Sequence, residues 1–236
     1  MISNFKLLII FFSLIVINLR AQSLTGITGM LNVPTAELLE DGEISFGASY
    51  LNKKYLPATF TNDDGLAYYV TVGFLPFAEL SIRFTKRMAP IDALGDKMFS
   101  FRIRLVQEKE VIPSILIGIH DPFHSTEKIT NKFSALYLAT TKNIPLGKLF
   151  NNFKISFGYG TEMINASSHQ FKGFFGGISF EFIHLLELIG EYDSQIFNTG
   201  VKLNLFNPIK SINLPLRTKA FTIVSSPKKF SFKNCK

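Results

Sequence analysis

The chain has 236 residues, a formal net charge of +7 and a single cysteine, Cys235. One cysteine excludes an intrachain disulfide framework and a multi-cysteine metal site. The basic residues are scattered, and their only cluster, Lys228–Lys229, has the pattern of a solvated tail, so the charge does not indicate nucleic-acid binding. Phenylalanine is frequent, with 25 residues, and tryptophan is absent. Such a content of large aromatics requires a large two-sheet core or a lipid-facing surface.

The first residues have the pattern of an export signal. Lys6 precedes the apolar run Leu7–Leu19, and the small residue Ala21 follows. A basic start, a short apolar core and a small residue at the cleavage point predict a secretory signal peptide over residues 1–21. The alternative is a membrane anchor, but the run is shorter than the roughly 20 residues that a spanning helix needs. We therefore expect an exported protein of the cell envelope.

The next segment, Gly26–Gly47 with the sequence GITGMLNVPTAELLEDGEISFG, is rich in turn formers. Thr35 can cap a short helix over residues 36–39, which are good helix formers, and Gly42 is a natural stop. The pattern therefore predicts a turn and a short helix within residues 22–42. The sequence leaves open whether these residues plug the following domain or lie in the periplasm.

From Glu43 onward, apolar and polar residues alternate with a period of two, which is the mark of strands with one apolar and one polar face. No amphipathic helix longer than about ten residues matches the helical template. Eleven strands are predicted: Glu43–Tyr50, Leu66–Phe74, Ala78–Lys86, Met98–Leu105, Val111–Ile119, Ser134–Lys142, Phe153–Tyr159, Gly173–Phe182, Leu186–Asp193, Gly200–Leu205 and Leu216–Val224. A further strand is expected near Ile27–Leu31 or Lys229–Phe232, because bacterial barrels have an even number of strands.

Connections between the predicted strands alternate in length. The long, polar ones are 51–65, 87–97, 120–133 and 160–172, the short ones are 75–77, 106–110 and 183–185, and 143–152 is intermediate. Outer-membrane barrels alternate in this way, with short periplasmic turns and long outer loops, whereas soluble sandwiches have no reason to. The pattern breaks at Ser194–Ile196, where a short turn replaces a long one. We predict an all-β, antiparallel transmembrane β-barrel of about 12 strands over residues 43–236, with a soluble sandwich as the alternative.

In such a barrel, one face of each strand meets lipid and the other lines the lumen. Basic residues on the inward face come mainly from the early strands and acidic residues from the late ones. We expect them to pair across a narrow lumen, because an unpaired buried charge costs several kcal/mol. The predicted lumen charges are Glu79, Arg83, Arg102, Arg104, Lys154, Glu181, Glu187, Glu191 and Lys202.

Catalytic and cofactor motifs are scarce. The chain has no G-x-S-x-G elbow and no glycine-rich phosphate loop, and Gly176–Gly177 lies inside a predicted strand. His120, His124, Ser125 and His169 could serve a rim-located hydrolase or a metal, but Pro122 argues against a helix that would bring His120 and His124 to one face. Asp63-Asp64-Gly65 has the pattern of a turn, with weak binding of a cation as the alternative. We assign no catalytic residue, no cofactor and no metal, and expect a protein that is not an enzyme.

Gly26–Gly47 resembles the opening of the YjbH-like exopolysaccharide and capsule outer-membrane protein family, with its glycine, Pro-Thr-Ala and acidic-Gly-Glu series. The resemblance continues at Tyr69–Thr85, YVTVGFLPFAELSIRFT, at Pro113–Phe123, PSILIGIHDPF, at Ser134–Lys142 and at Phe153–Gly160. Residues 161–236 show no match. Members of this family are often longer lipoproteins, whereas this chain has no lipid-attachment cysteine near the cleavage point and room for one barrel.

The resemblance implies a non-enzymatic outer-membrane component that acts in exopolysaccharide or capsule biosynthesis or export. Its expected partners are outer-membrane lipid, polysaccharide and other envelope export proteins, with no nucleic acid. The alternative is a small pore or structural barrel that has no polysaccharide role.

Overall fold

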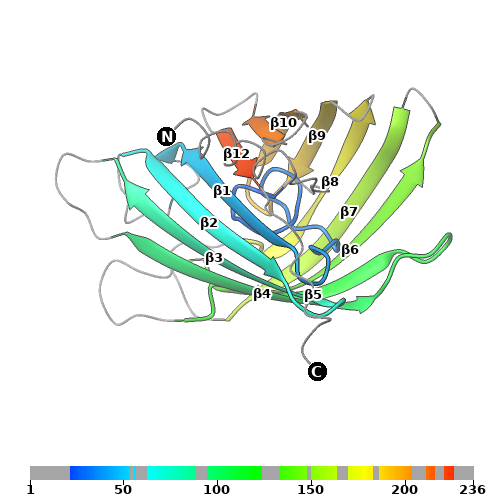
Figure 1. The fold of residues 1–236 in the computed structure, drawn as a ribbon, viewed down its shortest axis with the longest axis horizontal. Coiled ribbons are helices and arrows are strands. Elements are labelled where there is room, and N and C mark those ends of the chain that lie inside the picture. The colour runs from blue at the N-terminus through cyan, green and yellow to red at the C-terminus, as the bar shows by residue number, and fades with distance from the viewer. Residues whose placement is uncertain are drawn as a thin grey trace, which may run out of the picture.

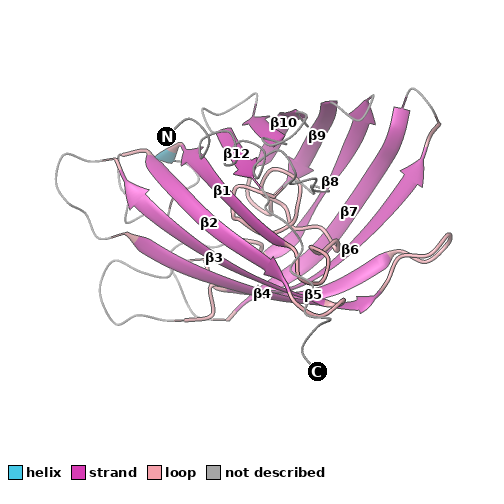
Figure 2. Ribbon diagram, viewed as in Figure 1, coloured by secondary structure: helices cyan, strands magenta, loops and turns pink. Residues whose placement is uncertain are grey.

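A computed structural model describes residues 22–53, 56, 63–88, 95–123, 133–147, 150–163, 170–182, 186–203, 211–215 and 221–225. The predicted signal peptide, His124, Ser125, His169, Lys228–Phe232 and Cys235 lie outside these ranges. Among the described residues, no helix is both long enough and apolar enough to cross a membrane. The all-β class that the alternation predicts is confirmed (Figure 2).

All strands pair with antiparallel neighbours, in the order β1-β12-β11-β10-β9-β8-β7-β6-β5-β4-β3-β2. β1 pairs with β2 on one side and with β12 on the other, where Phe46 lies opposite Ser225 and Tyr50 opposite Phe221. Following the hydrogen-bonded strands from β1 through β12 and on to β2 therefore leads back to β1. The strands are β1 (Ile44–Leu51), β2 (Gly65–Gly73), β3 (Ala78–Arg87), β4 (Asp96–Val106), β5 (Ser114–His120), β6 (Ala135–Pro145), β7 (Phe150–Glu162), β8 (Gly173–Phe182), β9 (Leu186–Tyr192), β10 (Phe197–Leu203), β11 (Ser211–Pro215) and β12 (Phe221–Ser225).

Most strand boundaries fall within a few residues of those predicted. β5 begins at Ser114 rather than Val111, because Pro113 has no N–H to donate to a ladder. β11 was not predicted, and the strand expected near Ile27–Leu31 is wrong, since that stretch makes only isolated bridges such as Gln22 with Thr28. β6 and β7 extend toward each other, so the connection between them is the short stretch 146–149.

The sheet curves around the N-terminal segment, which Figure 1 draws in blue inside the strands. We call residues 22–39 the inner segment and the side of the sheet that it contacts the concave face. Within the inner segment every residue except Glu37 is buried. Its apolar residues Val33, Ala36 and Leu38 pack with Tyr137 and Phe175 of the sheet in one core cluster. The inner segment therefore fills part of the space that the strands surround.

The short helix predicted over residues 36–39 is wrong, because these residues have no helical hydrogen bonds. The N–H of Ala36 instead donates to Thr141 Oγ1 at 2.7 Å, and the N–H of Leu39 donates to Glu79 Oε2 at 2.9 Å. Polar groups of the concave face thus replace the carbonyls that would accept these bonds in a helix. Local propensity is a weak preference that such tertiary contacts override.

The convex face is apolar along the strand interiors, as the alternation predicts. Exposed large side chains on this face include Phe46, Tyr68, Val70, Leu80, Ile82, Phe84, Ile117, Leu136, Leu138, Ile155, Phe157, Phe174, Ile178, Phe180, Leu188 and Phe197. The concave face carries hydroxyl and charged groups at the alternate positions, for example Thr71, Ser81 and Arg83. The sheet is therefore apolar on the outside and polar on the inside, the reverse of a soluble sandwich.

Aromatic rings on the concave face lie over glycines of the neighbouring strand. Gly47 faces Tyr69, Gly118 faces Tyr137 and Gly158 faces Phe175 across the ladder. A Cβ at Gly118 would lie 2.4 Å from Cζ of Tyr137, so no side chain fits there without movement. Such pairing of an aromatic ring with a cross-strand glycine lays the ring against the sheet and leaves room for the inner segment.

Candidate functional site

The candidate site is the contact between the concave face and the inner segment. Its centre is the ion pair between Glu79 of β3 and Arg102 of β4, with Arg102 Nη2 2.8 Å from Glu79 Oε1. The two residues are register partners on neighbouring strands, and neither side chain is exposed to solvent. A buried pair of this kind is stable only if further hydrogen bonds satisfy its remaining donors and acceptors.

The inner segment supplies those further hydrogen bonds. Glu79 accepts from Thr28 Oγ1 at 2.6 Å, from Thr28 N at 3.2 Å and from Leu39 N at 2.9 Å. Arg102 donates to the carbonyls of Thr28 at 2.8 Å, Thr35 at 3.0 Å and Glu37 at 2.7 Å. One ion pair of the sheet therefore binds both donors and acceptors of the segment, at points eleven residues apart along the chain.

A second carboxylate binds the middle of the segment. Glu191 of β9 accepts from the consecutive backbone N–H groups of Leu31 at 3.1 Å, Asn32 at 2.8 Å and Val33 at 3.1 Å. Successive N–H groups that converge on one anion form a nest, which has a local positive potential. The buried Glu191 carboxylate is thus held by backbone dipoles and by Asn198 Nδ2 at 3.3 Å.

Asn32 links this carboxylate to a chain of hydrogen bonds through the interior. Its Nδ2 donates to Asp193 Oδ2 at 2.8 Å, and its Oδ1 accepts from Gln170 Nε2 at 2.9 Å. Gln170 Oε1 lies 3.2 Å from Nε2 of His120, whose Nδ1 lies 2.7 Å from Ser100 Oγ. The chain runs from β4 to the turn after β9 by way of the inner segment.

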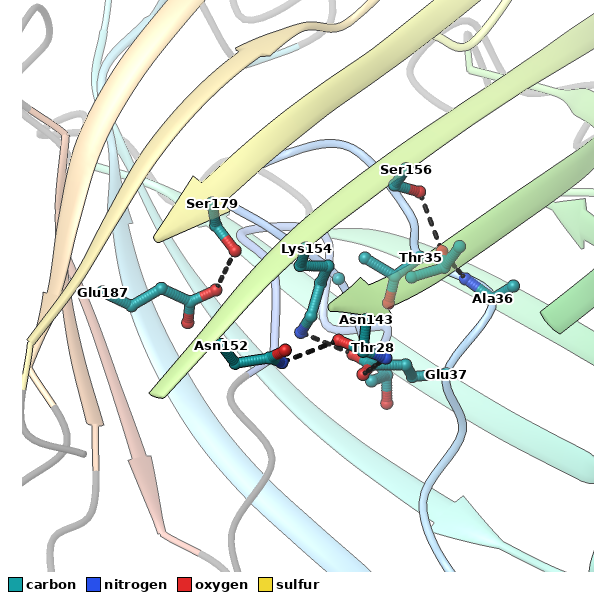
Figure 3. Close-up of polar contacts among 12 residues, drawn as sticks. Thr28, Thr35, Ala36, Glu37, Asn143, Asn152, Lys154, Ser156, Ser179 and Glu187 are labelled. Carbon is teal, nitrogen blue, oxygen red and sulfur yellow. Dashed lines mark hydrogen bonds and ion pairs between the residues drawn. The ribbon is translucent and has the colours of Figure 1, made fainter. Parts of the chain in front are cut away.

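The remaining charges pair locally (Figure 3). Lys154 of β7 points to the segment's Glu37, with Nζ 2.7 Å from Oε2. Lys202 of β10 lies 3.2 Å from its register partner Glu187 of β9, which also accepts from Ser179 at 2.6 Å. The pairing of early-strand bases with late-strand acids across the lumen is wrong for these groups, because neighbouring strands and the inner segment supply the partners.

Of the other predicted lumen charges, Arg83 lies in the middle of β3, whereas Arg104 and Glu181 lie near the ends of β4 and β8. Arg83 is buried and donates to the carbonyl of Leu24 at 3.5 Å, with Met98 Sδ also in contact. Arg104 is half-buried and donates to the carbonyl of Pro76, and Glu181 is half-buried on β8. The structure therefore gathers Glu79, Arg83, Arg102, Lys154, Glu191 and Lys202 around the inner segment, whereas Arg104 contacts the turn after β2.

The residues weighed for catalysis have structural partners where they are described. His120 is fully buried in the hydrogen-bonded chain above. Asp63 pairs with Arg87, and Asp64 accepts from Lys53 N at 3.0 Å and from the Tyr50 hydroxyl. Within the described ranges, no group of three or more His, Cys, Asp or Glu residues is placed to hold a metal ion.

Sequence reasoning missed the residues of the inner segment itself, above all Thr28 and Asn32. The only signal was the density of turn formers in a stretch with few charges, which indicates irregular backbone but not what that backbone contacts.

Residues 21–216 match the YjbH family, described as exopolysaccharide biosynthesis protein YbjH. The chain belongs to this family. Among curated proteins, it is 28% identical over 132 residues to the uncharacterized lipoprotein YjbH of Escherichia coli strain K12. The match covers 52% of this chain and 17% of that lipoprotein, so this chain spans only a small part of its relative. The family match includes the inner segment and the strands β1 to β11.

Proposed function

We propose that this chain is a non-enzymatic, closed β-barrel of the outer membrane that acts in the biosynthesis or export of exopolysaccharide. The family to which it belongs supports the polysaccharide role. The observation that carries the rest of the proposal is the filled interior: the inner segment is bound by Glu79, Arg102 and Glu191 from opposite parts of the strand order.

Membrane insertion is supported by the two faces and by the strand order. A bilayer requires every backbone polar group in its apolar core to be bonded within the protein, which strands achieve only in a closed ring. Here β1 has partners on both sides, and the convex face presents aromatic and aliphatic side chains. With the chain's start in the periplasm, the connections after β1, β3, β5 and β7 face outward.

A role other than catalysis is supported by the way the interior charges are used. Glu79, Arg102 and Glu191 are fully or almost fully buried, and their polar atoms bind the inner segment. A substrate would have to displace that segment to reach them. The same occupancy disfavours the alternative of a small open pore, whose lumen would have to admit water and ions.

The proposed partners are outer-membrane lipid, polysaccharide and other proteins of the export system. We expect these contacts on the convex face and on the outer connections, because the inner segment occupies the concave face. An indirect role, in which the barrel positions export proteins and conducts no polymer itself, fits a filled interior better than conduction does.

A deletion strain tests the proposal. The amount of surface polysaccharide is measured together with the intracellular pool, and membrane fractions are probed for the complementing protein. The proposal predicts loss at the surface, with accumulation inside if the step is export and depletion inside if the step is biosynthesis. Unchanged pools in both places would contradict the polysaccharide role, and recovery of the protein in the soluble fraction would contradict the membrane barrel.

A further inference from the structure

Two lysines lie on neighbouring strands at one end of the apolar convex face. Lys86 of β3 continues the exposed series Leu80, Ile82 and Phe84, and Lys97 is an exposed residue near the start of β4. Phe84 is the register partner of Lys97, which makes Lys86 and Lys97 diagonal neighbours across the ladder. Diagonal neighbours in an antiparallel pair lie roughly 7–8 Å apart, so both ammonium groups can reach one ligand.

The charges of this lysine pair are not matched within the described part of the chain. Neither lysine makes a hydrogen bond or ion pair with another described residue, whereas the adjacent Arg87 pairs with Asp63. Asp96 precedes Lys97, but it is 1% exposed and faces the concave side. The lysine pair therefore presents two positive charges on the outside of the sheet.

An apolar surface borders the lysine pair along β2 and β3. Tyr68, Val70, Ile82 and Phe84 are all exposed on the convex face, and Tyr68 lies directly opposite Phe84. The Phe84 ring lies against Gly95, because a Cβ at that glycine would clash with it. On the lipid-facing side of a barrel a basic residue is costly at the bilayer midplane and tolerated near the interface. The lysine pair therefore marks an edge of the apolar band.

The lysine pair and the apolar surface together select an anion with a hydrocarbon part. Lysine binds phosphate as a point charge, so inorganic phosphate or an acidic polysaccharide could pair with the ammonium groups. Either of them would leave the adjoining apolar side chains exposed to water, which is unfavourable. An anionic lipid uses both features, because its phosphate meets the lysines and its acyl chains cover the apolar side chains.

We propose that Lys86 and Lys97 together bind the phosphate of an anionic membrane lipid, whose acyl chains lie along β2 and β3. This inference rests on the proposed function, because it requires the convex face to lie in a bilayer. It does not depend on which leaflet the lysines face. The selectivity comes from the charge of the headgroup, whereas the rest of the convex face contacts the acyl chains of any lipid.

The test uses the full chain purified from membranes and stripped of lipid in detergent. Anionic phosphatidylglycerol and zwitterionic phosphatidylethanolamine with the same acyl chains are titrated separately, and bound lipid is counted by native mass spectrometry. The test variant is Lys86→Gln, Lys97→Gln, and inorganic phosphate is added as a competitor. The matched control, Lys109→Gln, Lys172→Gln, removes the same charge at exposed lysines elsewhere. Both variants change only exposed side chains, so both should fold.

We expect wild type and the control to bind phosphatidylglycerol roughly tenfold more tightly than phosphatidylethanolamine, because two basic residues near a membrane surface attract an anionic headgroup. This preference should disappear in Lys86→Gln, Lys97→Gln, and inorganic phosphate at the concentration of the lipid should not displace it. Equal affinity of wild type for the two lipids would overturn the inference. An equal loss of the preference in both variants, or displacement by inorganic phosphate, would also overturn it.

Fractionation separates this result from the proposed function. Wild type and both variants should be recovered from the outer membrane, because the substitutions leave the strands and the apolar face intact. Recovery of wild type in the soluble fraction would count against the barrel itself. A membrane-bound protein without a headgroup preference would count against the lysine pair alone.

Discussion

Glu79 and Arg102 form a buried ion pair whose two members also bind the backbone of a segment that precedes the sheet. Removing one partner leaves the other charge buried and unpaired, which typically costs about 3–5 kcal/mol. We therefore expect Glu79→Gln and Arg102→Gln each to lower the free energy of unfolding by that amount. The double variant should lose less than the sum of the two, because it leaves no unpaired charge.

Urea unfolding of the purified protein in detergent measures these differences. The control is Lys172→Gln, which removes an ion pair with Glu162 whose lysine side chain is 47% exposed. An exposed pair contributes roughly 0–1 kcal/mol, so this variant should unfold close to wild type. Strict additivity of the two buried substitutions would contradict the assigned pairing.

Glu191 binds three successive backbone amides of the inner segment, and Glu191→Gln should release them. Hydrogen bonds to a charged group contribute about 1.5–3 kcal/mol, and the amide side chain presents an N–H group where the carboxylate presents an oxygen. We expect the amides of Leu31, Asn32 and Val33 to exchange with deuterium about tenfold to a hundredfold faster. Mass spectrometry of peptides from the inner segment measures this exchange.

The matched control is Glu110→Gln, at an exposed residue of the connection between β4 and β5. Exchange in the inner segment should then equal that of wild type. Equal exchange rates in Glu191→Gln and wild type would mean that the nest does not depend on the carboxylate.

Because aromatic rings cover some glycines and not others, we expect the effect of a glycine-to-alanine substitution on stability to depend on its position. At Gly118, a new Cβ would clash with the Tyr137 ring, and overpacking of this kind costs about 1–3 kcal/mol. At Gly190, on the convex face, the Cβ meets open space. We expect Gly118→Ala to unfold at a lower urea concentration than wild type and Gly190→Ala to unfold at an equal or higher one. A destabilisation of the same size at both positions would indicate a general strand effect instead.

Asp121 lies directly after β5, and its buried carboxyl should make the stability of the fold depend on pH. It is 1% exposed, and burial, together with the nearby Asp96, raises the pKa of its carboxyl from 3.8 to about 7 although Arg83 lowers it. The folded state therefore retains a proton that the unfolded state loses at lower pH. Stability should fall as the pH rises from about 4 to about 7 and then level off.

Asp121→Asn removes this titration and keeps the shape of the side chain, and asparagine tolerates the positive φ of 51° at this position. The difference in unfolding free energy between pH 5 and pH 8 should be smaller in the variant than in wild type. The variant should gain stability relative to wild type at pH 8. If the unfolding free energies of wild type and Asp121→Asn changed in parallel with pH, Asp121 would not be the cause of the pH dependence.

The outer architecture could be predicted because it follows from a local rule. Alternation with a period of two places Leu80, Ile82 and Phe84 on one face and Glu79, Ser81 and Arg83 on the other, whatever the rest of the chain does. β11 was not predicted, because a strand of five residues that ends at Pro215 is too short to show a clear alternation.

The contacts of the inner segment could not be predicted for the opposite reason, although the sequence left open that residues 22–42 plug the domain. Its contacts join residues far apart in sequence, such as Asn32 with Glu191, and they bind backbone groups that are the same in every residue. The sequence of residues 36–39 favours a helix locally, but the concave face supplies Thr141 and Glu79 as alternative partners. Charges that the alternation correctly placed on one face were therefore assigned the wrong partners.

Planar-bilayer conductance of the purified full chain tests most directly whether the inner segment closes the interior. We expect no steady open-channel current for wild type, and a measurable current for the double variant Glu79→Gln, Glu191→Gln, in which the segment loses the two carboxylates that bind its backbone. A steady wild-type current as large as that of the double variant would contradict the account and favour an open pore.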